Sequence, residues 1–295
     1  MTISFDGQVA IVTGSGRGLG RSYARELAAR GARVAVVDLG PDAASVAGEI
    51  VQGGGIARGY EVDVTDFEAV TSMAGEIMSD WGRVDVLINN AGILRDKSFA
   101  KMDLTDFRTV VDVHLMGSVN CAKAVWQTMI DRKYGRILFT SSSSGMYGNF
   151  GQSNYGAAKA AMLGLMNVLH LEGEKHGIRV NCVTPSAATH MTEGLLKPAH
   201  EKLLTPESVA PGVAFLVSRD APSRVIIAAG AGSFARIYVT ETQGVSFPPD
   251  RLTAEAVRDS FHAISDTNGA VPLQTAFQQT DKLAALALHA SASGE

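Results

Sequence analysis

The chain is poor in cysteine and carries no metal-ligand motif. Its 295 residues include only two cysteines, Cys121 and Cys182, which lie in apolar stretches and have no CxxC spacing. A disulfide framework or a zinc site is therefore not expected, and the two thiols indicate a reducing compartment. We expect no metal site in this protein.

An excess of charge and a long apolar run are also absent. Lys and Arg number 26 against 30 Asp and Glu, the net charge is -4, and no basic run occurs. This balance argues against a general nucleic-acid binder, which needs clustered cations. No run approaches the roughly 20 apolar residues that span a bilayer. The first strand-like run, Val9 to Thr13, leaves no space before it for a signal segment. We expect a cytoplasmic protein with no nucleic-acid or membrane partner.

Short β-branched runs alternate with longer segments of helical spacing. The strand-like runs are 8–13, 33–38, 84–90, 135–141 and 178–184, and the helical segments are 21–29, 67–81, 107–130 and 155–175. This order predicts an α/β fold, a single Rossmann-type doubly wound parallel sheet with helices on both faces. Ligands bind such sheets beyond the carboxyl ends of the strands.

The alternation stops after about Ala228. We assign residues 1–230 to a dinucleotide-binding catalytic domain, with a substrate lid at about 186–210. Residues 231–295 are punctuated by Gly and Pro and contain only a weak helical pattern, from Thr253 to Ile264. We interpret them as a C-terminal extension packed on the main domain or on a partner subunit, not as an independent domain.

A glycine-rich turn, TGSGRGLG, runs from Thr13 to Gly20. It follows a predicted strand and opens a predicted helix, so its backbone N–H groups can approach a pyrophosphate. The candidate contacts are Gly14, Arg17, Gly18, Leu19 and Gly20. A purely structural turn is the alternative.

Asp38 ends the second predicted strand, where a carboxylate can accept hydrogen bonds from the adenosine ribose hydroxyls. The same charge would repel a 2′-phosphate, so we expect NAD rather than NADP. Arg17 keeps NADP open, because it could reach a phosphate from the glycine turn. Asp38 could instead cap a helix, although Asp42, after Pro41, is better placed for that.

Tyr155 and Lys159 stand four residues apart in NYGAAK, and Ser142 precedes Tyr155 by thirteen residues. Residues i and i+4 share one face of a helix, so the lysine can stand behind the phenol and lower its pKa. Such a phenol can exchange a proton with an alcohol whose carbon gives hydride to a nicotinamide. A serine hydroxyl can stabilise the charge on that oxygen. Ser141, Ser143 and Ser144 are competing candidates, and spacing alone does not exclude Ser143.

These motifs together resemble the short-chain dehydrogenase/reductase family over about residues 5–230. The motifs that carry the resemblance are TGSGRGLG, Asp63-Val64, NNAG at 89–92, Ser142, the Tyr155 and Lys159 pair, and 181–185. The resemblance implies that Asp63 and Val64 border the adenine, that Asn90, Ala91 and Gly92 line the cofactor, and that Ser142 binds the substrate oxygen. It also implies that Tyr155 is the acid/base and that Lys159 holds the nicotinamide ribose.

Two positions depart from the family pattern. His114 stands in VDVHLMGS where the family usually has an Asn that supports a proton relay; a structural histidine is the alternative. The Pro-Gly that the family has after the strand at 178–184 is Pro185-Ser186 here. Pro185 and Thr189 remain candidate cofactor contacts, with Thr189 at the carboxamide.

The segments VHLMGS, MYGNFGQSNYGAAK and TPESVAP resemble the dehydrogenase portion of peroxisomal multifunctional β-oxidation enzymes and their bacterial relatives. The resemblance implies a (3R)-3-hydroxyacyl-CoA substrate. A hydroxysteroid or another secondary alcohol is the alternative, and a nicotinamide-binding sensor without turnover is the alternative of another class.

Apolar residues around the predicted site indicate an apolar or acyl-CoA substrate, or equally a subunit interface. They are Met146, Tyr147, Phe150, Met191, Leu195 and Leu196. Lys197 and Lys202 could meet CoA phosphates or be solvated charges. By resemblance we expect a homodimer or homotetramer, with the helices from Phe107 and Tyr155 as interfaces.

Overall fold

The computed structural model describes residues 2–188 and 198–292. The chain divides into two compact units, Met1–Arg236 and Ile237–Glu295. This division falls a few residues after the boundary expected near 230. Whether the second unit can fold independently stays a prediction.

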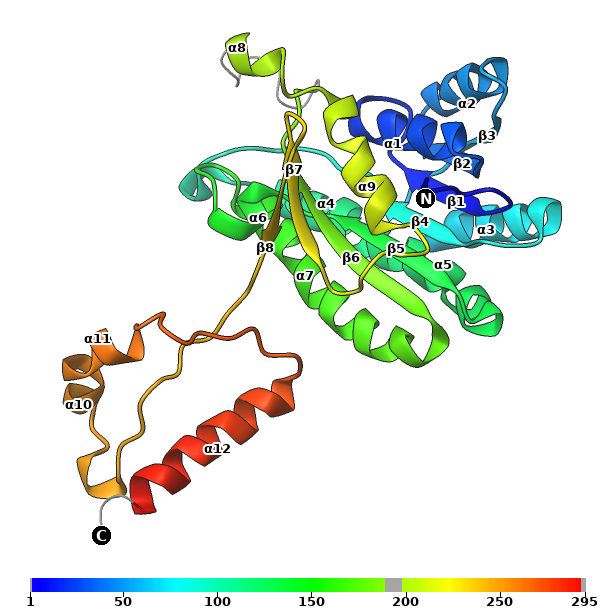
Figure 1. Cartoon of the computed structure of the whole chain (residues 1–295). Helices are drawn as coiled ribbons and strands as arrows, with labels where there is room; N and C mark the ends of the chain where they lie inside the picture. Colours follow the sequence, from blue (N-terminus) through cyan, green and yellow to red (C-terminus); the bar gives the residue numbers. More distant parts are fainter. Residues whose placement is uncertain (1, 189–197, 293–295) are drawn as a thin grey trace. The chain divides into compact units, whose positions relative to one another are not determined.

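The first unit is built on one twisted sheet, whose strand order in the described part of the chain is β3-β2-β1-β4-β5-β6-β7-β8 (Figure 1). Its strands are β1 (Val9–Thr13), β2 (Arg33–Asp38), β3 (Ile56–Glu61), β4 (Val86–Asn89), β5 (Gly135–Thr140), β6 (Ile178–Pro185), β7 (Ile226–Gly230) and β8 (Ser233–Ile237). Neighbours from β3 to β7 pair in parallel. The order reverses direction between β1 and β4, the switch point at which doubly wound sheets bind ligands. The predicted fold class is confirmed.

Helices cover both faces of the sheet (Figure 1). One face carries α1 (Gly18–Ala29), α2 (Asp42–Gln52) and α9 (Ala210–Leu216). The other carries α3 (Phe67–Trp81), α5 (Gly117–Arg132) and α7 (Ser153–Gly173), with α4 (Leu104–Val111) against α7. Shorter pieces are η1 (Phe99–Lys101), η2 (Asp112–Met116), α6 (Ser143–Tyr147), η3 (Glu174–His176), α8 (Pro198–Glu201) and η5 (Pro206–Ser208).

The segment predicted as one helix from 107 to 130 is interrupted. Residues Asp112–Met116, labelled η2, form a π-helical turn between α4 and α5, and His114 is its central residue. A π turn inserts an extra residue into the helical repeat and thereby changes the direction of the side chains around it.

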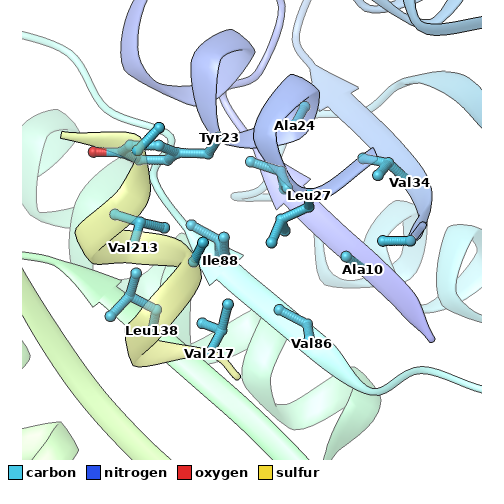
Figure 2. Packing of buried hydrophobic residues seen from close by; sticks show 14 of the residues in the cluster. Ala10, Tyr23, Ala24, Leu27, Val34, Val86, Ile88, Leu138, Val213 and Val217 are labelled. Atoms are coloured by element: carbon cyan, nitrogen blue, oxygen red, sulfur yellow. The ribbon is translucent and has the colours of Figure 1, made fainter. Parts of the chain in front are cut away.

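The core of the first face lies between the sheet and the helices α1, α2 and α9. Leu27 of α1 and Val213 of α9 are almost fully buried and pack over Val86 and Ile88 of β4 (Figure 2). The strands contribute alternate residues to this face, since successive side chains of a strand point to opposite sides. This packing fixes α1, and with it the turn between β1 and α1.

The polypeptide reverses direction after β7 in a two-residue turn. Ala231 and Gly232 both have positive φ, 51° and 71°, as type I′ hairpin turns require. A connection of two residues joins antiparallel strands, so β8 is the antiparallel edge of an otherwise parallel sheet. This hairpin replaces the irregular structure expected after Ala228.

The second unit contains η6 (Pro249–Arg251), α10 (Ala254–Asp259), α11 (Phe261–Ile264) and α12 (Ala276–Ala292). The weak helical pattern from Thr253 to Ile264 corresponds to α10 and α11, whereas α12 was not expected. Lys282 of α12 donates to Glu241 at 2.9 Å, and Glu241 pairs with Val271 through an antiparallel bridge. These contacts hold α12 to the chain that precedes α10.

Both cysteines are buried and free, Cys121 on α5 and Cys182 on β6. No helix within residues 2–188 and 198–292 is long and apolar enough to cross a membrane.

Candidate active site

The glycine turn lies between β1 and α1 and has no space for side chains at three of its positions, Gly14, Gly16 and Gly20. A Cβ on Gly14, whose φ is 60°, would lie 2.7 Å from the Ala91 Cα, and one on Gly20 would lie 2.2 Å from the Gly14 carbonyl oxygen. Gly18, the first residue of α1, also has positive φ, 55°. Glycine is therefore required by close approach at Gly14, Gly16 and Gly20 and by conformation at Gly14 and Gly18.

The N-terminus of α1 is open to an anion. None of the described side chains caps this helix, and its first turn contains no acidic residue. Free N–H groups and the positive end of the helix dipole thus face the turn. Arg17, immediately before α1, is exposed beside it. These features fit a pyrophosphate.

Asn90 joins the glycine turn to the end of β4. Its side-chain nitrogen donates to the carbonyl oxygens of Thr13 and Gly14, each at 3.0 Å. The Thr13 hydroxyl in turn accepts from the backbone nitrogens of Asn90 and Ala91, at 3.0 and 3.1 Å. The NNAG segment therefore holds the glycine turn in place through these hydrogen bonds, and residues of the same segment line the cavity.

Asp38, the last residue of β2, is held by two backbone donors. Its carboxylate accepts from the Gly16 nitrogen at 2.8 Å and from the Leu39 nitrogen at 2.9 Å. It does not cap a helix, and neither does Asp42, which is the first residue of α2 and makes no side-chain cap hydrogen bond among the described residues. The fixed carboxylate faces the space where a ribose would lie.

A cavity of about 660 Å³ opens along these elements. Ten residues predicted to bind cofactor line it, namely Gly14, Arg17, Gly18, Leu19, Asp38, Asp63, Val64, Asn90, Ala91 and Gly92. The sequence analysis missed seven others, Val37, Leu39, Val62, Ile93, Leu94, Arg95 and Val113. Most of these are direct neighbours of predicted residues, so adjacency was the available signal.

The other predicted cofactor residues do not line this cavity. Gly20 is buried behind the turn. Pro185 ends β6, and the next residue, Ser186, donates its backbone nitrogen to Ala229 at 2.8 Å. Tyr155 and Lys159 belong to the candidate catalytic residues, which adjoin the cavity. Thr189 lies outside the described residues.

Tyr155 and Lys159 share one face of α7, as the spacing predicted. The Lys159 Nζ lies 5.6 Å from the centre of the Tyr155 ring and donates to the Thr140 carbonyl oxygen at 2.6 Å. Ser142 directly precedes α6, and its hydroxyl accepts from the Ser144 nitrogen at 3.1 Å. The three side chains therefore meet where β5 ends and α7 begins.

Two of the three neighbouring serines have other partners. Ser141 is buried and donates to the Lys159 carbonyl oxygen at 2.7 Å, and Ser144 donates to the Gln152 side chain at 2.7 Å. Ser143 is exposed on α6. A hydrogen bond between Ser142 and Tyr155 lowers the phenol pKa, which favours Ser142 over the other three.

Burial governs the charge of both proton-carrying groups. It raises the pKa of Tyr155, which the Ser142 hydrogen bond lowers and the charge of Asp96 raises further. This direction is opposite to the lowering expected from the Tyr155 and Lys159 spacing. Burial also lowers the pKa of Lys159 to about 7, because the ammonium has lost most of its water. Near neutral pH, Lys159 is thus a partial cation only.

His114 lies beside the candidate catalytic residues Ser142, Tyr155 and Lys159. Its ring packs edge-on against the Tyr155 ring, with centres 5.2 Å apart, and its Nε2 lies 2.8 Å from the Ile93 carbonyl oxygen. A Cβ on Gly92 would lie 2.1 Å from the imidazole, so the ring fills the space that a side chain would need. The Nδ1 is buried without a hydrogen-bond partner among the described residues.

Burial, followed by the charge of Lys159, lowers the pKa of His114 to about 3. The imidazole is therefore neutral at physiological pH. A neutral ring can accept or donate one hydrogen bond at each nitrogen, depending on its tautomer. Its part in a proton relay stays a prediction.

The substrate side of the site is partly described. Tyr147 and Phe150 are highly exposed, with 76% and 91% of their surfaces accessible, and Met146 is half-buried beside them. Lys202 is exposed. Met191, Leu195, Leu196 and Lys197 lie outside the described residues. Among the residues that the structure covers, no cluster of three His, Cys, Asp or Glu side chains could hold a metal ion.

Comparison with known proteins gives consistent matches. The model of the short chain dehydrogenase family matches residues 8–199. The peroxisomal hydratase-dehydrogenase-epimerase of Saccharomyces cerevisiae is 41% identical over 281 residues, which cover 90% of this chain and 31% of the yeast protein.

Two solved structures extend this similarity. Full-length peroxisomal multifunctional enzyme type 2 from Drosophila melanogaster has a TM-score of 0.82 and 37% identity, covering 95% of this chain and 49% of that one. A 7α-hydroxysteroid dehydrogenase complexed with NADH and 7-oxo glycochenodeoxycholic acid has a TM-score of 0.73 and 30% identity, covering 78% and 95%. The chain thus spans about a third of the yeast relative and about half of the fly protein.

Proposed function

The chain belongs to the short-chain dehydrogenase family, and on that premise we propose that it oxidises (3R)-3-hydroxyacyl-CoA thioesters to 3-oxoacyl-CoA with NAD. The observation that carries the proposal is the group of Ser142, Tyr155 and Lys159 beside a cavity lined by the glycine turn. The multifunctional peroxisomal proteins to which the chain is similar support the acyl-CoA substrate. The chain spans only part of these proteins, so their other activities are not transferred to it.

The residues of the chain would act as follows. The free N–H groups at the start of α1 would bind the pyrophosphate, and the Asp38 carboxylate would accept hydrogen bonds from the ribose hydroxyls. The bound nicotinamide supplies the hydride acceptor. Ser142 would donate a hydrogen bond to the substrate oxygen as negative charge develops there, and Tyr155 would take the hydroxyl proton. Lys159 would be more fully charged when an anionic group or phenolate lies beside it, and that charge would in turn stabilise the Tyr155 phenolate.

NAD is the proposed cofactor because the Asp38 carboxylate stands at the end of β2 with both oxygens held by backbone donors. A 2′-phosphate placed there would meet like charge at short range. Arg17 supports NADP as the alternative, since it is exposed at the cavity.

A hydroxysteroid or another secondary alcohol is the second candidate substrate. The observation that favours it is the similarity to the 7α-hydroxysteroid dehydrogenase. The same three catalytic residues would serve either substrate. A sensor that binds nicotinamide without turnover would have no use for a serine and a tyrosine placed on one substrate oxygen.

One experiment separates these alternatives. NADH formation is followed with a panel of (3R)-hydroxyacyl-CoAs and hydroxysteroids, and the panel is repeated with NADP. We expect turnover of the acyl-CoAs with NAD. Turnover of steroids without turnover of acyl-CoAs would contradict the proposed substrate. A preference for NADP would contradict the proposed cofactor. Binding of NADH without any turnover would support the nicotinamide-binding sensor.

We further propose a homodimer or homotetramer and a cytoplasmic location. The location rests on the two free buried thiols, which fit a reducing compartment. Light scattering and cell fractionation test these two proposals; a monomer or an organelle-bound protein would contradict them.

A further inference from the structure

Gln152, the residue before α7, has a fully engaged side-chain amide. Only 8% of the residue is exposed. Its Oε1 accepts from the Ser144 hydroxyl at 2.7 Å and from the Asn149 side chain at 3.1 Å, and its Nε2 donates to the Asp96 carboxylate at 2.7 Å. Since a carboxylate can only accept and the Asn149 nitrogen can only donate, the orientation of the amide is unambiguous.

The three partners come from three different segments. Ser144 belongs to α6, the helix that begins directly after Ser142. Asn149 belongs to the loop from α6 to α7. Asp96 belongs to the loop after β4, which leads away from the cofactor cavity. The Gln152 backbone carbonyl oxygen also accepts from the Gly156 nitrogen at 2.7 Å, in the first turn of α7. Gln152 is thus bound to α7 through its backbone, and its side chain connects that point to α6 and to the loop after β4.

Two further contacts attach the same loop to the start of α7. The Lys97 nitrogen donates to the Gly151 carbonyl oxygen at 2.9 Å. The Asn154 side chain, which is fully buried, donates to the Arg95 carbonyl oxygen at 2.9 Å and accepts from the Tyr155 nitrogen at 2.7 Å. The loop after β4 is therefore bound to α7 on both sides of Gln152.

We propose that Asp96 is a positioning residue, which acts through the Gln152 amide to hold Ser142 and Tyr155 at the separation that proton transfer needs. The proposal rests on the function proposed above, because it concerns the same catalytic group. A hydrogen bond to a charged acceptor is stronger and shorter than one between neutral groups. Losing it would free the amide that joins α6 to α7.

The negative charge of Asp96 also acts on the phenol. Among the residues that the structure describes, the charged or titratable groups that face Tyr155 are Lys159 on its own helix, His114 on the π turn and Asp96 on the loop after β4. Asp96 disfavours the phenolate and so opposes the pKa lowering that Ser142 provides. Its neighbours Arg95 and Lys97 both contact Asp106 instead.

The test uses variants that separate shape, hydrogen bonding and charge in the full chain. Asp96→Ala removes the acceptor, and Gln152→Met keeps the length of the side chain but removes its polar atoms. Asp96→Asn keeps an acceptor and removes the charge. Two matched controls are Gln127→Met, an exposed glutamine on α5 that contacts Asp131, and Asp106→Asn, a neighbouring carboxylate.

The first measurement is hydrogen–deuterium exchange of residues 142–156, which needs no substrate. Asp96→Ala and Gln152→Met should both speed exchange there, and the double variant should add little to Gln152→Met alone because both changes break the same hydrogen bond. Gln127→Met should leave this segment unchanged. Wild-type exchange in Asp96→Ala, or additive effects in the double variant, would overturn the proposal.

The second measurement is the pH profile of kcat and KM with the substrate that the panel identifies. Gln152→Met should lower kcat about ten- to a hundredfold, because small misplacements of reacting groups are that costly, with less effect on KM. Asp96→Asn should shift the rise of kcat to lower pH, whereas Asp106→Asn should not. The same pH profile of kcat for Asp96→Asn and Asp106→Asn would contradict the proposal. If the wild-type protein turns over no substrate, the proposed function fails, and the exchange data still decide the role of Asp96.

Discussion

The Lys159 Nζ lies 5.6 Å from the centre of the Tyr155 ring and at the same time donates a hydrogen bond to the Thr140 carbonyl oxygen at 2.6 Å. The lysine is therefore anchored to β5 while it stands beside the phenol. Because its pKa is lowered to about 7 by burial, a small change in local charge near neutral pH changes how strongly it stabilises a phenolate.

Replacing Tyr155 with Phe should separate catalysis from binding. The ring and its packing against His114 remain, but the proton acceptor is lost, so kcat should fall about 10²- to 10⁴-fold. The affinity for NADH, measured by fluorescence titration, should change little. Tyr60→Phe is the control, because the Tyr60 hydroxyl is buried without a hydrogen-bond partner in the described part of the chain. Undiminished turnover in Tyr155→Phe would contradict the catalytic role.

His114 should make stability depend on acidity. Its pKa of about 3 lies below the ordinary 6.5, so between these values the unfolded chain binds a proton that the folded chain does not. Folding stability from this group is complete above pH 6.5 and declines as the pH falls toward 3, by on the order of 2 kcal/mol at pH 4.5. Urea unfolding of His114→Asn should show a flatter decline than wild type, whereas His262→Asn, at an exposed position, should follow wild type.

Two glycine-to-alanine changes should have opposite outcomes. At Gly20, a Cβ would lie 2.2 Å from the Gly14 oxygen and 2.6 Å from the Asn90 side chain, so Gly20→Ala must displace the turn and should weaken NADH binding at least about tenfold. Gly48 lies inside α2, and no described heavy atom outside its own helix would come within 4 Å of its Cβ. Gly48→Ala should keep binding and raise stability by about 0.5–1 kcal/mol. Equal binding by both variants would refute the close-approach argument.

Removing the charge of Asp38 should relax the choice of cofactor. Asp38→Asn keeps an oxygen for the Gly16 nitrogen but no longer repels a 2′-phosphate, so the ratio of kcat/KM for NAD to that for NADP should fall at least about tenfold. Asp42→Asn, at the start of α2 nearby, is the matched change of charge. A ratio that stays constant in Asp38→Asn would assign the selectivity to other residues, with Arg17 the first to test.

The sequence predicted the strands that are buried on both faces of the sheet. β1, β2, β4, β5 and β6 are continuous apolar runs, and all five were expected. β3 was missed because it is an edge strand whose residues Ile56–Glu61 mix exposed and half-buried positions. α12 was missed because most of its described side chains are exposed, so packing against a core does not impose a helical pattern on its sequence.

Site residues were predicted from the sequence where a motif implies a definite backbone geometry. The glycines of the turn reveal close backbone approach, and the i, i+4 pair reveals a shared helix face. The direction of the Tyr155 pKa was not predictable, because burial of the phenol outweighs the Ser142 hydrogen bond and depends on the packing of residues distant in the chain. For the same reason the Gln152 amide and its partner Asp96, 56 residues apart, gave no local signal.

Asn90 limits which substitutions this chain can accumulate during evolution. Its side-chain amide donates to two carbonyl oxygens of the turn after β1, and its backbone nitrogen, directly after β4, donates to the Thr13 hydroxyl. A change at this position would disturb both halves of the nucleotide cradle together, and no single second substitution elsewhere would restore both. Lineages that keep the cradle should therefore keep this amide, even while the loops around the substrate diverge.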